Sequence, residues 1–221
     1  MIRTVIFDMD GVIVDTEPVH RYAFFRHFAE LGIEVSDTEY AKFTGSSTQN
    51  VYQQLKNQYG LTDGIDELMA RKREFFNRAF DEKPDLYLLG TVRELIEDLH
   101  AHNFQLILAS SASKGTIGRV MKRFELYPYF EHVISGEDFT YSKPDPAIFE
   151  HAASLAVGSK QECIIIEDST NGIAAGKAAG IYCIGYNSEH SAMQDLSQAD
   201  QVIHDFSELN ATSIAAIEPK A

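Results

Sequence analysis

The sequence predicts an α/β protein in which helices cover a parallel sheet and a helical block is inserted after the first strand. Short apolar runs that are typical of buried strands recur along the chain, and stretches with helical spacing separate most of them. This alternation predicts a parallel sheet with helices on both faces. Residues 17–83 are the exception, because this long stretch has helical patterns and no strand-like run. It is interpreted as an insertion.

The sheet is expected to contain six strands. The apolar runs that predict them lie at residues 4–7, 104–109, 131–134, 163–166, 181–186 and 201–204. Between these runs, a helix is expected over 146–156, with Asp145 as its N-cap and Pro146 at its first position. A second helix is expected over 171–179, where Gly180 ends it.

The inserted block repeats apolar residues at the spacing of a helix core. The repeats are Phe24, Phe28 and Leu31 in one stretch and Val51, Leu55 and Tyr59 in another. The predicted domains are therefore a catalytic core of residues 1–16 and 84–221 and a helical cap of residues 17–83, with hinges near residues 15–18 and 83–88.

Composition narrows the classes of partner. The chain has 221 residues, and 33 acidic against 19 basic residues give a formal charge of -14, which argues against nucleic acid or an anionic membrane surface. Cys163 and Cys183 both lie in apolar runs and are interpreted as buried thiols of a reducing compartment. No apolar run approaches the length of a membrane span, so a cytoplasmic protein is expected, as a monomer or weak dimer.

Two carboxylates follow the first predicted strand. Residues i and i+2 of an extended chain face the same way, so Asp8 and Asp10 project together while Met9 turns toward the core. Gly11 then allows the backbone to bend. A turn would also use Asp and Gly here, but other strand ends carry reactive groups as well, and ligands of open α/β sheets bind outside the carboxyl ends of the strands.

Three further groups are expected at that edge. Ser110 and Ser111 follow the second predicted strand just before a helix start, where hydroxyl and backbone N–H groups can bind phosphate. Glu167 and Asp168 end another strand before a helix. Lys143 precedes a proline that keeps it out of helical geometry, so its ammonium can be aimed. Helix capping could explain one of the serines, or the two acids taken alone. It does not explain why serines, acids and a lysine all follow strand ends.

These groups together predict phosphoryl transfer. Asp8 can attack phosphorus and form an aspartyl-phosphate, and Asp10 can protonate the leaving alkoxide and later activate water. Mg²⁺ is expected on Asp8, the carbonyl of Asp10 and Asp168. Glu167 would bind it directly or through water. Lys143 and the Ser110 hydroxyl would hold phosphoryl oxygens in the transition state.

Four stretches carry a family resemblance. In order and spacing, FDMDGVIVDTE, ILASSAS, YSKPDPAIF and IIIEDSTNGI resemble the four motifs of the haloacid dehalogenase-like superfamily. The position of the insert resembles the subclass of β-phosphoglucomutase and sugar-phosphate phosphatases. The resemblance implies a Rossmann-like core, a mobile helical cap and Mg²⁺, with Asp8 as nucleophile, Asp10 as acid and base, Ser110 and Lys143 on phosphate, and Asp168 on metal.

The cap is expected to choose the substrate. Its loop around Gly45, Ser46 and Thr48 resembles the specificity loop of such caps. The same small polar residues are also typical of a helix N-cap, so that alternative stays open. His20 and Lys72 match the pattern of β-phosphoglucomutases, and each is alternatively an ordinary surface-helix residue.

The expected function is hydrolysis of a small phosphorylated metabolite, most simply a sugar or polyol phosphate. The alternative is a phosphomutase, which is disfavoured because Thr48 stands where β-phosphoglucomutases carry an arginine for the second phosphate. A dehalogenase would need neither Mg²⁺ nor Asp10, and a non-enzymatic phosphoryl-binding module would not need a cap.

Overall fold

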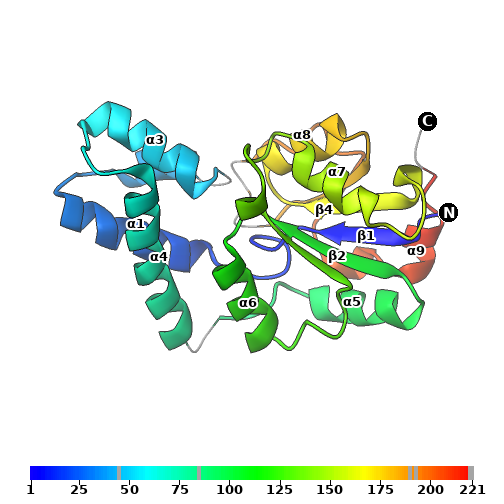
Figure 1. Cartoon of the computed structure of the whole chain (residues 1–221). Helices are drawn as coiled ribbons and strands as arrows, with labels where there is room; N and C mark the ends of the chain where they lie inside the picture. The colour runs from blue at the N-terminus through cyan, green and yellow to red at the C-terminus, as the bar shows by residue number, and fades with distance from the viewer. Residues whose placement is uncertain (44–45, 84–85, 189–190, 192–193, 219–221) are drawn as a thin grey trace. The chain divides into compact units, whose positions relative to one another are not determined.

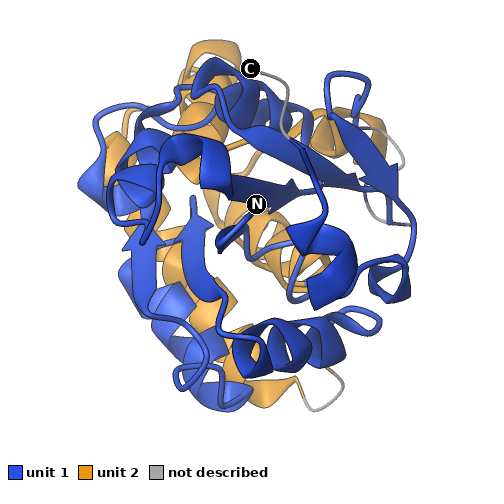
Figure 2. Ribbon diagram, turned by 90° about the vertical axis from the view of Figure 1, so that its right-hand side faces the viewer, with its two compact units in different colours: residues 1–15, 87–221 blue, residues 16–86 orange. Residues whose placement is uncertain are grey.

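The computed structural model describes residues 1–43, 46–83, 86–188, 191 and 194–218. The chain divides into two compact units, which Figure 2 colours separately. Unit 1 contains Met1–Asp15 and Tyr87–Ala221, and unit 2 contains Thr16–Leu86. The second unit is thus one continuous insertion into the first.

Unit 1 contains a fully parallel sheet of six strands. Its order is β3-β2-β1-β4-β5-β6. The strands are β1 (Thr4–Phe7), β2 (Gln105–Ser110), β3 (His132–Ser135), β4 (Cys163–Glu167), β5 (Tyr182–Tyr186) and β6 (Gln201–Ile203). Every residue of β1, β2 and β4 is buried, as expected for strands covered on both faces. The predicted α/β fold with a parallel sheet is confirmed.

Helices cover the sheet on both faces. Figure 1 shows α7 and α8 on one face and α5 and α9 on the other. The helices of unit 1 are α5 (Val92–Ala101), α6 (Lys114–Arg123), α7 (Ala147–Ser154), α8 (Thr170–Ala178) and α9 (Ala211–Ala215), with short 3-10 turns η2 (Gly136–Asp138), η3 (Lys160–Glu162) and η5 (Phe206–Glu208). Alternate strand residues such as Ile6, Ile107 and Ile165 pack with Phe149 of α7 and Ile173 of α8 in one core. The sheet is therefore a rigid platform for whatever follows its strand ends.

All elements of unit 2 within its described residues are helices, joined by turns and loops. Its elements are α1 (Glu17–Leu31), α2 (Asp37–Tyr40), η1 (Ala41–Phe43), α3 (Thr48–Tyr59) and α4 (Ile65–Glu82). An aromatic core holds them together: Phe24 and Phe28 of α1 pack with Tyr40, Tyr52 of α3 and Leu68 of α4. Figure 1 shows α1, α3 and α4 as three long helices. The expected helical content of the insertion is confirmed.

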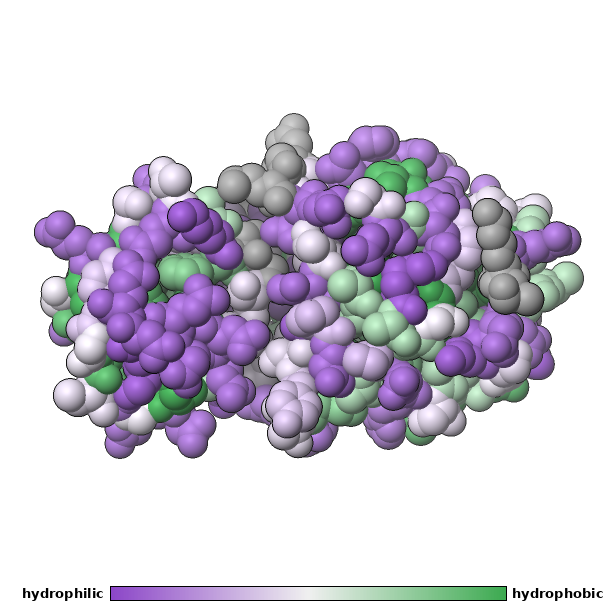
Figure 3. Space-filling model, turned by 90° about the horizontal axis from the view of Figure 1, so that it is seen from above, coloured by the Kyte–Doolittle hydropathy of each residue, from purple (hydrophilic) through white to green (hydrophobic). Residues whose placement is uncertain are grey.

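One face of the molecule is predominantly hydrophilic (Figure 3). Seen from above the view of Figure 1, hydrophilic residues cover most of the face, with apolar residues scattered between them (Figure 3). Within the described ranges, no helix is both long and apolar enough to cross a bilayer.

Candidate active site

The carboxyl ends of three neighbouring strands meet at one edge of the sheet. Phe7, the last residue of β1, pairs with Leu108 of β2 on one side and with Ile166 of β4 on the other. Asp8 extends this pairing, because its backbone N–H donates to the Ile166 carbonyl at 3.0 Å. Chain order reverses at β1, which makes this edge the topological switch point where α/β proteins bind ligands.

Lys143 ties these strand ends together. Its Nζ lies 2.5 Å from Asp8 Oδ1, 3.0 Å from Glu167 Oε1 and 3.2 Å from the carbonyl oxygen of Ala109. The residue is only 7% exposed, and its ammonium also lies 4.6 Å from the centre of the Phe149 ring. These bonds use the three N–H donors that an ammonium has. A lysine placed in a loop more than 130 residues from Asp8 is thus fixed beside the predicted nucleophile.

Burial and charge perturb the groups of this cluster. Burial raises the pKa of Asp8 to about 7, which Lys143 opposes and the Glu167 carboxylate reinforces. Burial alone would lower the pKa of Lys143, but the carboxylates of Asp8 and Glu167 outweigh it and raise that pKa, so the lysine is charged. One ammonium faces several carboxylates. The cluster therefore has an excess of negative charge that a proton or a cation would relieve.

Asp168 joins the cluster through a contact that requires glycine. Gly11 has a φ of 85°, and a Cβ built on it would lie 2.1 Å from Oδ2 of Asp168. The carboxylate thus packs directly on the backbone next to Asp10. Burial and then the carboxylates of Glu167, Asp8 and Asp10 raise the pKa of Asp168 well above its usual range.

The donor set suits a hard divalent cation. It consists of carboxylate and carbonyl oxygens, which are the ligands that Mg²⁺ prefers, and Gly11 leaves the space in which the Asp168 carboxylate approaches the backbone. Within the described ranges, no three His, Cys, Asp or Glu side chains are already grouped as a closed metal site. Asp8, the Asp10 carbonyl and Asp168 are the residues that would hold the ion.

Glu167 is occupied by other partners. Its Oε1 accepts from Lys143, and its Oε2 accepts from the backbone N–H of Ser169 at 2.7 Å and from the Ser169 hydroxyl at 2.9 Å. Gly172 makes room for this carboxylate, since a Cβ there would lie 1.6 Å from Oε1. Sequence reasoning missed the part played by Ser169, which also caps α8. The position of Ser169, directly before a predicted helix and two residues after Glu167, could have indicated this role.

The serines after β2 divide their roles. The Ser110 side chain is buried, and its Oγ accepts the N–H of Ala112 at 3.1 Å. Ser111 is exposed. Ser113 caps α6 by accepting from Thr116 N at 3.2 Å, so capping explains that serine only. Ser110 and Ser111 remain for the predicted phosphate role.

Unit 2 brings His20 and Lys72 together. Lys72 Nζ lies 2.6 Å from His20 Nδ1 across α1 and α4. Because an ammonium can only donate, Nδ1 is the acceptor and carries no proton. The His20 ring lies 4.4 Å from the Phe76 ring, and Lys72 Nζ lies 4.4 Å from the centre of the Phe24 ring. Burial and the Lys72 charge lower the pKa of His20 well below 6.5.

The predicted specificity loop begins a helix. Ser47 is the N-cap of α3 and accepts from Asn50 N at 3.2 Å, and Thr48 is the first helical residue. Ser46 donates its backbone N–H to the Phe43 carbonyl. Gly45 lies outside the described residues. Capping thus accounts for Ser47, and a substrate role for Ser46 or Thr48 stays a prediction.

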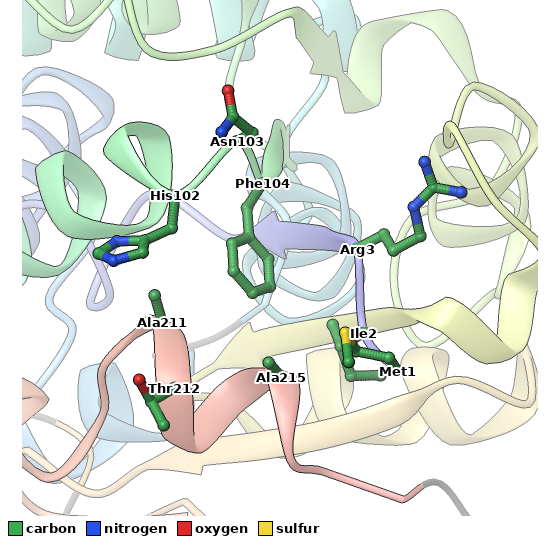
Figure 4. Close-up of a pocket in the computed structure, with 9 residues that line it drawn as sticks. All are labelled: Met1, Ile2, Arg3, His102, Asn103, Phe104, Ala211, Thr212 and Ala215. Atoms are coloured by element: carbon green, nitrogen blue, oxygen red, sulfur yellow. The ribbon is translucent and has the colours of Figure 1, made fainter.

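A cavity of about 440 Å³ lies elsewhere in unit 1. It opens at the amino ends of β1 and β2, where Ile2 and Phe104 face Ala211 and Ala215 of α9 (Figure 4). Asp8 and Lys143 lie at the opposite, carboxyl ends of the strands. This cavity is therefore separate from the candidate active site.

Comparison with known proteins agrees with the four sequence motifs. Residues 5–186 match the model of the haloacid dehalogenase-like hydrolases. The chain belongs to this family. A phosphorylated-carbohydrates phosphatase of Thermotoga maritima is 29% identical over 86% of this chain and 86% of its own length. The expected enzyme class, a phosphoric monoester hydrolase, is confirmed at that level.

Two solved structures resemble this hydrolase in fold. CbbY from Rhodobacter sphaeroides, solved with phosphate, has a TM-score of 0.87 at 24% identity and covers 98% of this chain and 100% of its own. The β-phosphoglucomutase of Clostridium difficile has a TM-score of 0.83 at 24% identity and covers 97% and 96%. At this identity the likeness concerns the fold alone. It confirms the expected Rossmann-like architecture.

Proposed function

We propose that this hydrolase is a Mg²⁺-dependent phosphatase that cleaves a small phosphorylated metabolite, a sugar or polyol phosphate, through an aspartyl-phosphate on Asp8. The observation that carries the proposal is the contact of Lys143 with both Asp8 and Glu167 at the switch point of the sheet. A fixed cation beside a buried carboxylate and the Ser110 loop forms a site for a phosphoryl group. The named activity of the Thermotoga maritima relative supports the substrate class.

The chain's own residues divide the chemistry between them. Asp8 attacks phosphorus, the bond to the ester oxygen breaks, and Asp10 gives that oxygen its proton. Asp10 then takes a proton from the water that cleaves the aspartyl-phosphate, so the carboxylate of Asp8 is regenerated. Bound Mg²⁺ would neutralise charge on the phosphate and on the carboxylates around it.

Lys143 must exchange one partner during this reaction. All three of its donors are used, by Asp8, Glu167 and the Ala109 carbonyl. The bond to Asp8 is the one to release, because the phosphoryl group becomes bonded to this carboxylate and brings its own oxygens to the same N–H group. Lys143 then holds a phosphoryl oxygen while Glu167 keeps the ammonium in place.

Substrate choice belongs to the helical insertion. We assign residues 1–16 and 84–221 to the catalytic core and 17–83 to a cap, an assignment that the division into compact units supports. His20 and Lys72 offer the cap a ring nitrogen and a cation for substrate hydroxyls. We place the enzyme in the cytoplasm as a monomer or weak dimer. Movement of the cap would exclude water and release product.

Phosphomutase activity is the second candidate. The His20–Lys72 contact favours it, because both residues match the β-phosphoglucomutase pattern and lie together. A mutase must also hold a second phosphate, and Thr48 is a helix-start residue with a neutral hydroxyl.

One assay tests the proposal, and one further substrate separates the two candidates. Turnover of p-nitrophenyl phosphate should stop in EDTA and return with excess Mg²⁺. An unchanged rate of turnover in EDTA would contradict Mg²⁺ dependence. With β-glucose 1-phosphate, a phosphatase releases inorganic phosphate, whereas conversion to glucose 6-phosphate with little phosphate released would establish the mutase instead.

A further inference from the structure

The end of β3 supports the predicted phosphate loop, residues 110–113, through a buried hydroxyl. Ser135 is the last residue of β3, pairs with Ser110 in the sheet and is 2% exposed. Its hydroxyl donates to the carbonyl oxygen of Ala112 at 2.7 Å and accepts the backbone N–H of Glu137 at 3.2 Å. Because a hydroxyl has only one proton, Ser135 has no donor left for a ligand. Ser135 can therefore act on a bound phosphate only through the loop.

The next residue, Gly136, supports the same loop by close packing. A Cβ built on Gly136 would lie 3.0 Å from Cα of Ser111, 3.3 Å from its carbonyl oxygen and 3.4 Å from its carbonyl carbon. Gly136 has no positive φ, so it is the lack of space beside Ser111, and not the backbone conformation, that requires glycine. An alanine at this position would press on the Ser111 backbone. Ser135 and Gly136 thus hold neighbouring peptides of the loop, the first by a hydrogen bond and the second by contact.

The supported peptides lie in the part of the loop that would bind phosphate. Ser110 Oγ accepts the N–H of Ala112 at 3.1 Å, which leaves the Ser110 proton for a phosphoryl oxygen. Ser111 is exposed, and no group of the described residues accepts a hydrogen bond from its backbone N–H. Groups that bind a ligand need packed and hydrogen-bonded neighbours to keep their productive geometry. Ser135 provides the hydrogen bond for Ala112, and Gly136 provides the packing for Ser111.

We propose that Ser135 and Gly136 are positioning residues that set the affinity of the phosphate loop for the transferred phosphoryl group. The inference rests on the proposed phosphatase function and adds two residues to its phosphate site. The phosphoryl group is common to every phosphate ester and to inorganic phosphate, so a displaced loop should weaken the binding of all of them alike. The choice between leaving groups should not change.

The test uses inorganic phosphate as the probe, in the presence of Mg²⁺. Its inhibition constant against p-nitrophenyl phosphate turnover is measured for wild type, Ser135→Ala and Gly136→Ala, and Tm is measured for each protein. The ratio of kcat/KM for glucose 6-phosphate to kcat/KM for p-nitrophenyl phosphate reports on leaving-group choice. A residue with a merely structural role would lower Tm and leave the inhibition constant unchanged.

Two control variants change the same residue types elsewhere in unit 1. Ser154→Ala removes a hydroxyl that donates to the His151 carbonyl at 2.6 Å in α7. Gly118→Ala adds a Cβ in α6 that would meet the Tyr127 hydroxyl at 3.6 Å, which is an ordinary contact. Neither control touches residues 110–113, so both should keep the wild-type inhibition constant even where Tm changes.

The inhibition constant of phosphate should rise about three- to tenfold in Ser135→Ala, as expected for the loss of one hydrogen bond, and at least as much in Gly136→Ala. The kcat/KM ratio of the two esters should stay within twofold of wild type. Ser135→Ala decides the question alone if Gly136→Ala does not fold. A phosphate constant within twofold of wild type, or a changed ester ratio, overturns the inference. A wild-type enzyme that does not hydrolyse p-nitrophenyl phosphate with Mg²⁺ would instead contradict the proposed function itself.

Discussion

Among the residues that the structure describes, each unit buries one lysine, and the surroundings of the two lysines differ. Lys143 of unit 1 is 7% exposed and contacts the carboxylates of Asp8 and Glu167. Lys72 of unit 2 is 3% exposed and contacts the neutral ring of His20 and the faces of Phe24 and Phe76. The Lys143 charge is balanced by these carboxylates, and the contacts of the Lys72 charge include an imidazole and aromatic rings.

We propose that this difference separates chemistry from substrate choice. A lysine fixed by carboxylates stabilises charge at one defined point, as phosphoryl transfer requires. We expect the N–H group that Lys72 directs at His20 to be the donor that a substrate hydroxyl or anion takes over. Removing the first lysine should therefore harm catalysis, and removing the second should harm binding.

The largest expected effect concerns the nucleophile of unit 1. Asp8→Asn should lower kcat by about 10³-fold or more, because a neutral amide is a poor nucleophile. Circular dichroism should show an intact fold. The control Asp66→Asn removes an exposed carboxylate of α4 and should retain activity. A loss below about tenfold in Asp8→Asn would remove the residue from its assigned role.

The next prediction tests the two lysines against each other. Lys143→Gln should lower kcat by about 10²–10³-fold, since one donor to the transition state is lost. Lys72→Gln should raise KM by about tenfold while kcat changes little. Steady-state kinetics on one sugar phosphate measures both. Equal effects on kcat in the two variants would abolish the distinction between the lysines.

Gly11 and Gly32 provide a matched pair of glycines. Both have positive φ, of 85° and 67°, but a Cβ on Gly11 meets the Asp168 carboxylate at 2.1 Å whereas Gly32 has nothing within 4 Å. Gly11→Ala should lower activity by about 10²-fold and raise the Mg²⁺ concentration for half-maximal activity. Gly32→Ala should keep activity and lose only about 1 kcal/mol of stability. If Gly11→Ala had the Mg²⁺ dependence of wild type, Asp168 would not be a ligand of the metal.

The smallest predicted effect is the pH dependence of unit 2. The pKa of His20 is below 6.5 in the folded state, so unfolding takes up a proton as pH falls below about 6.5 and stability is lost there. The full effect of one proton is about 2–5 °C of Tm per pH unit. His20→Gln should show a correspondingly flatter fall of Tm between pH 7 and pH 5. Parallel Tm curves would mean that His20 is not held neutral.

The sequence was sufficient to locate the sheet and its reactive edge. Predicted strand 4–7 coincides with β1, and the run 163–166 differs from β4 by one residue. Such buried parallel strands are marked by their own apolar residues. Asp145 was expected as an N-cap, but Pro146 takes that position and Asp145 Oδ1 accepts from Ala147 N. Helix starts depend on single backbone angles, which a pattern of residue types does not determine.

Contacts between distant residues could not be read from the sequence. The motifs placed Glu167 and Asp168 at the same edge, yet Glu167 contacts Lys143 and Ser169 while Asp168 contacts Gly11. Neighbours in a chain face different ways after a strand end, and only the packing decides which way. The contact of Lys72 with His20 likewise depends on how α1 and α4 pack.

The most direct test of the account is to trap the phosphoryl group on the chain. The enzyme is mixed with Mg²⁺ and p-nitrophenyl phosphate, quenched in acid within one turnover and digested for mass spectrometry. The account predicts a peptide that contains Asp8 and carries one added phosphoryl group, which hydroxylamine removes and which Asp8→Asn lacks. A burst of p-nitrophenol without any phosphoryl adduct on that peptide, or an adduct on another residue, would contradict it.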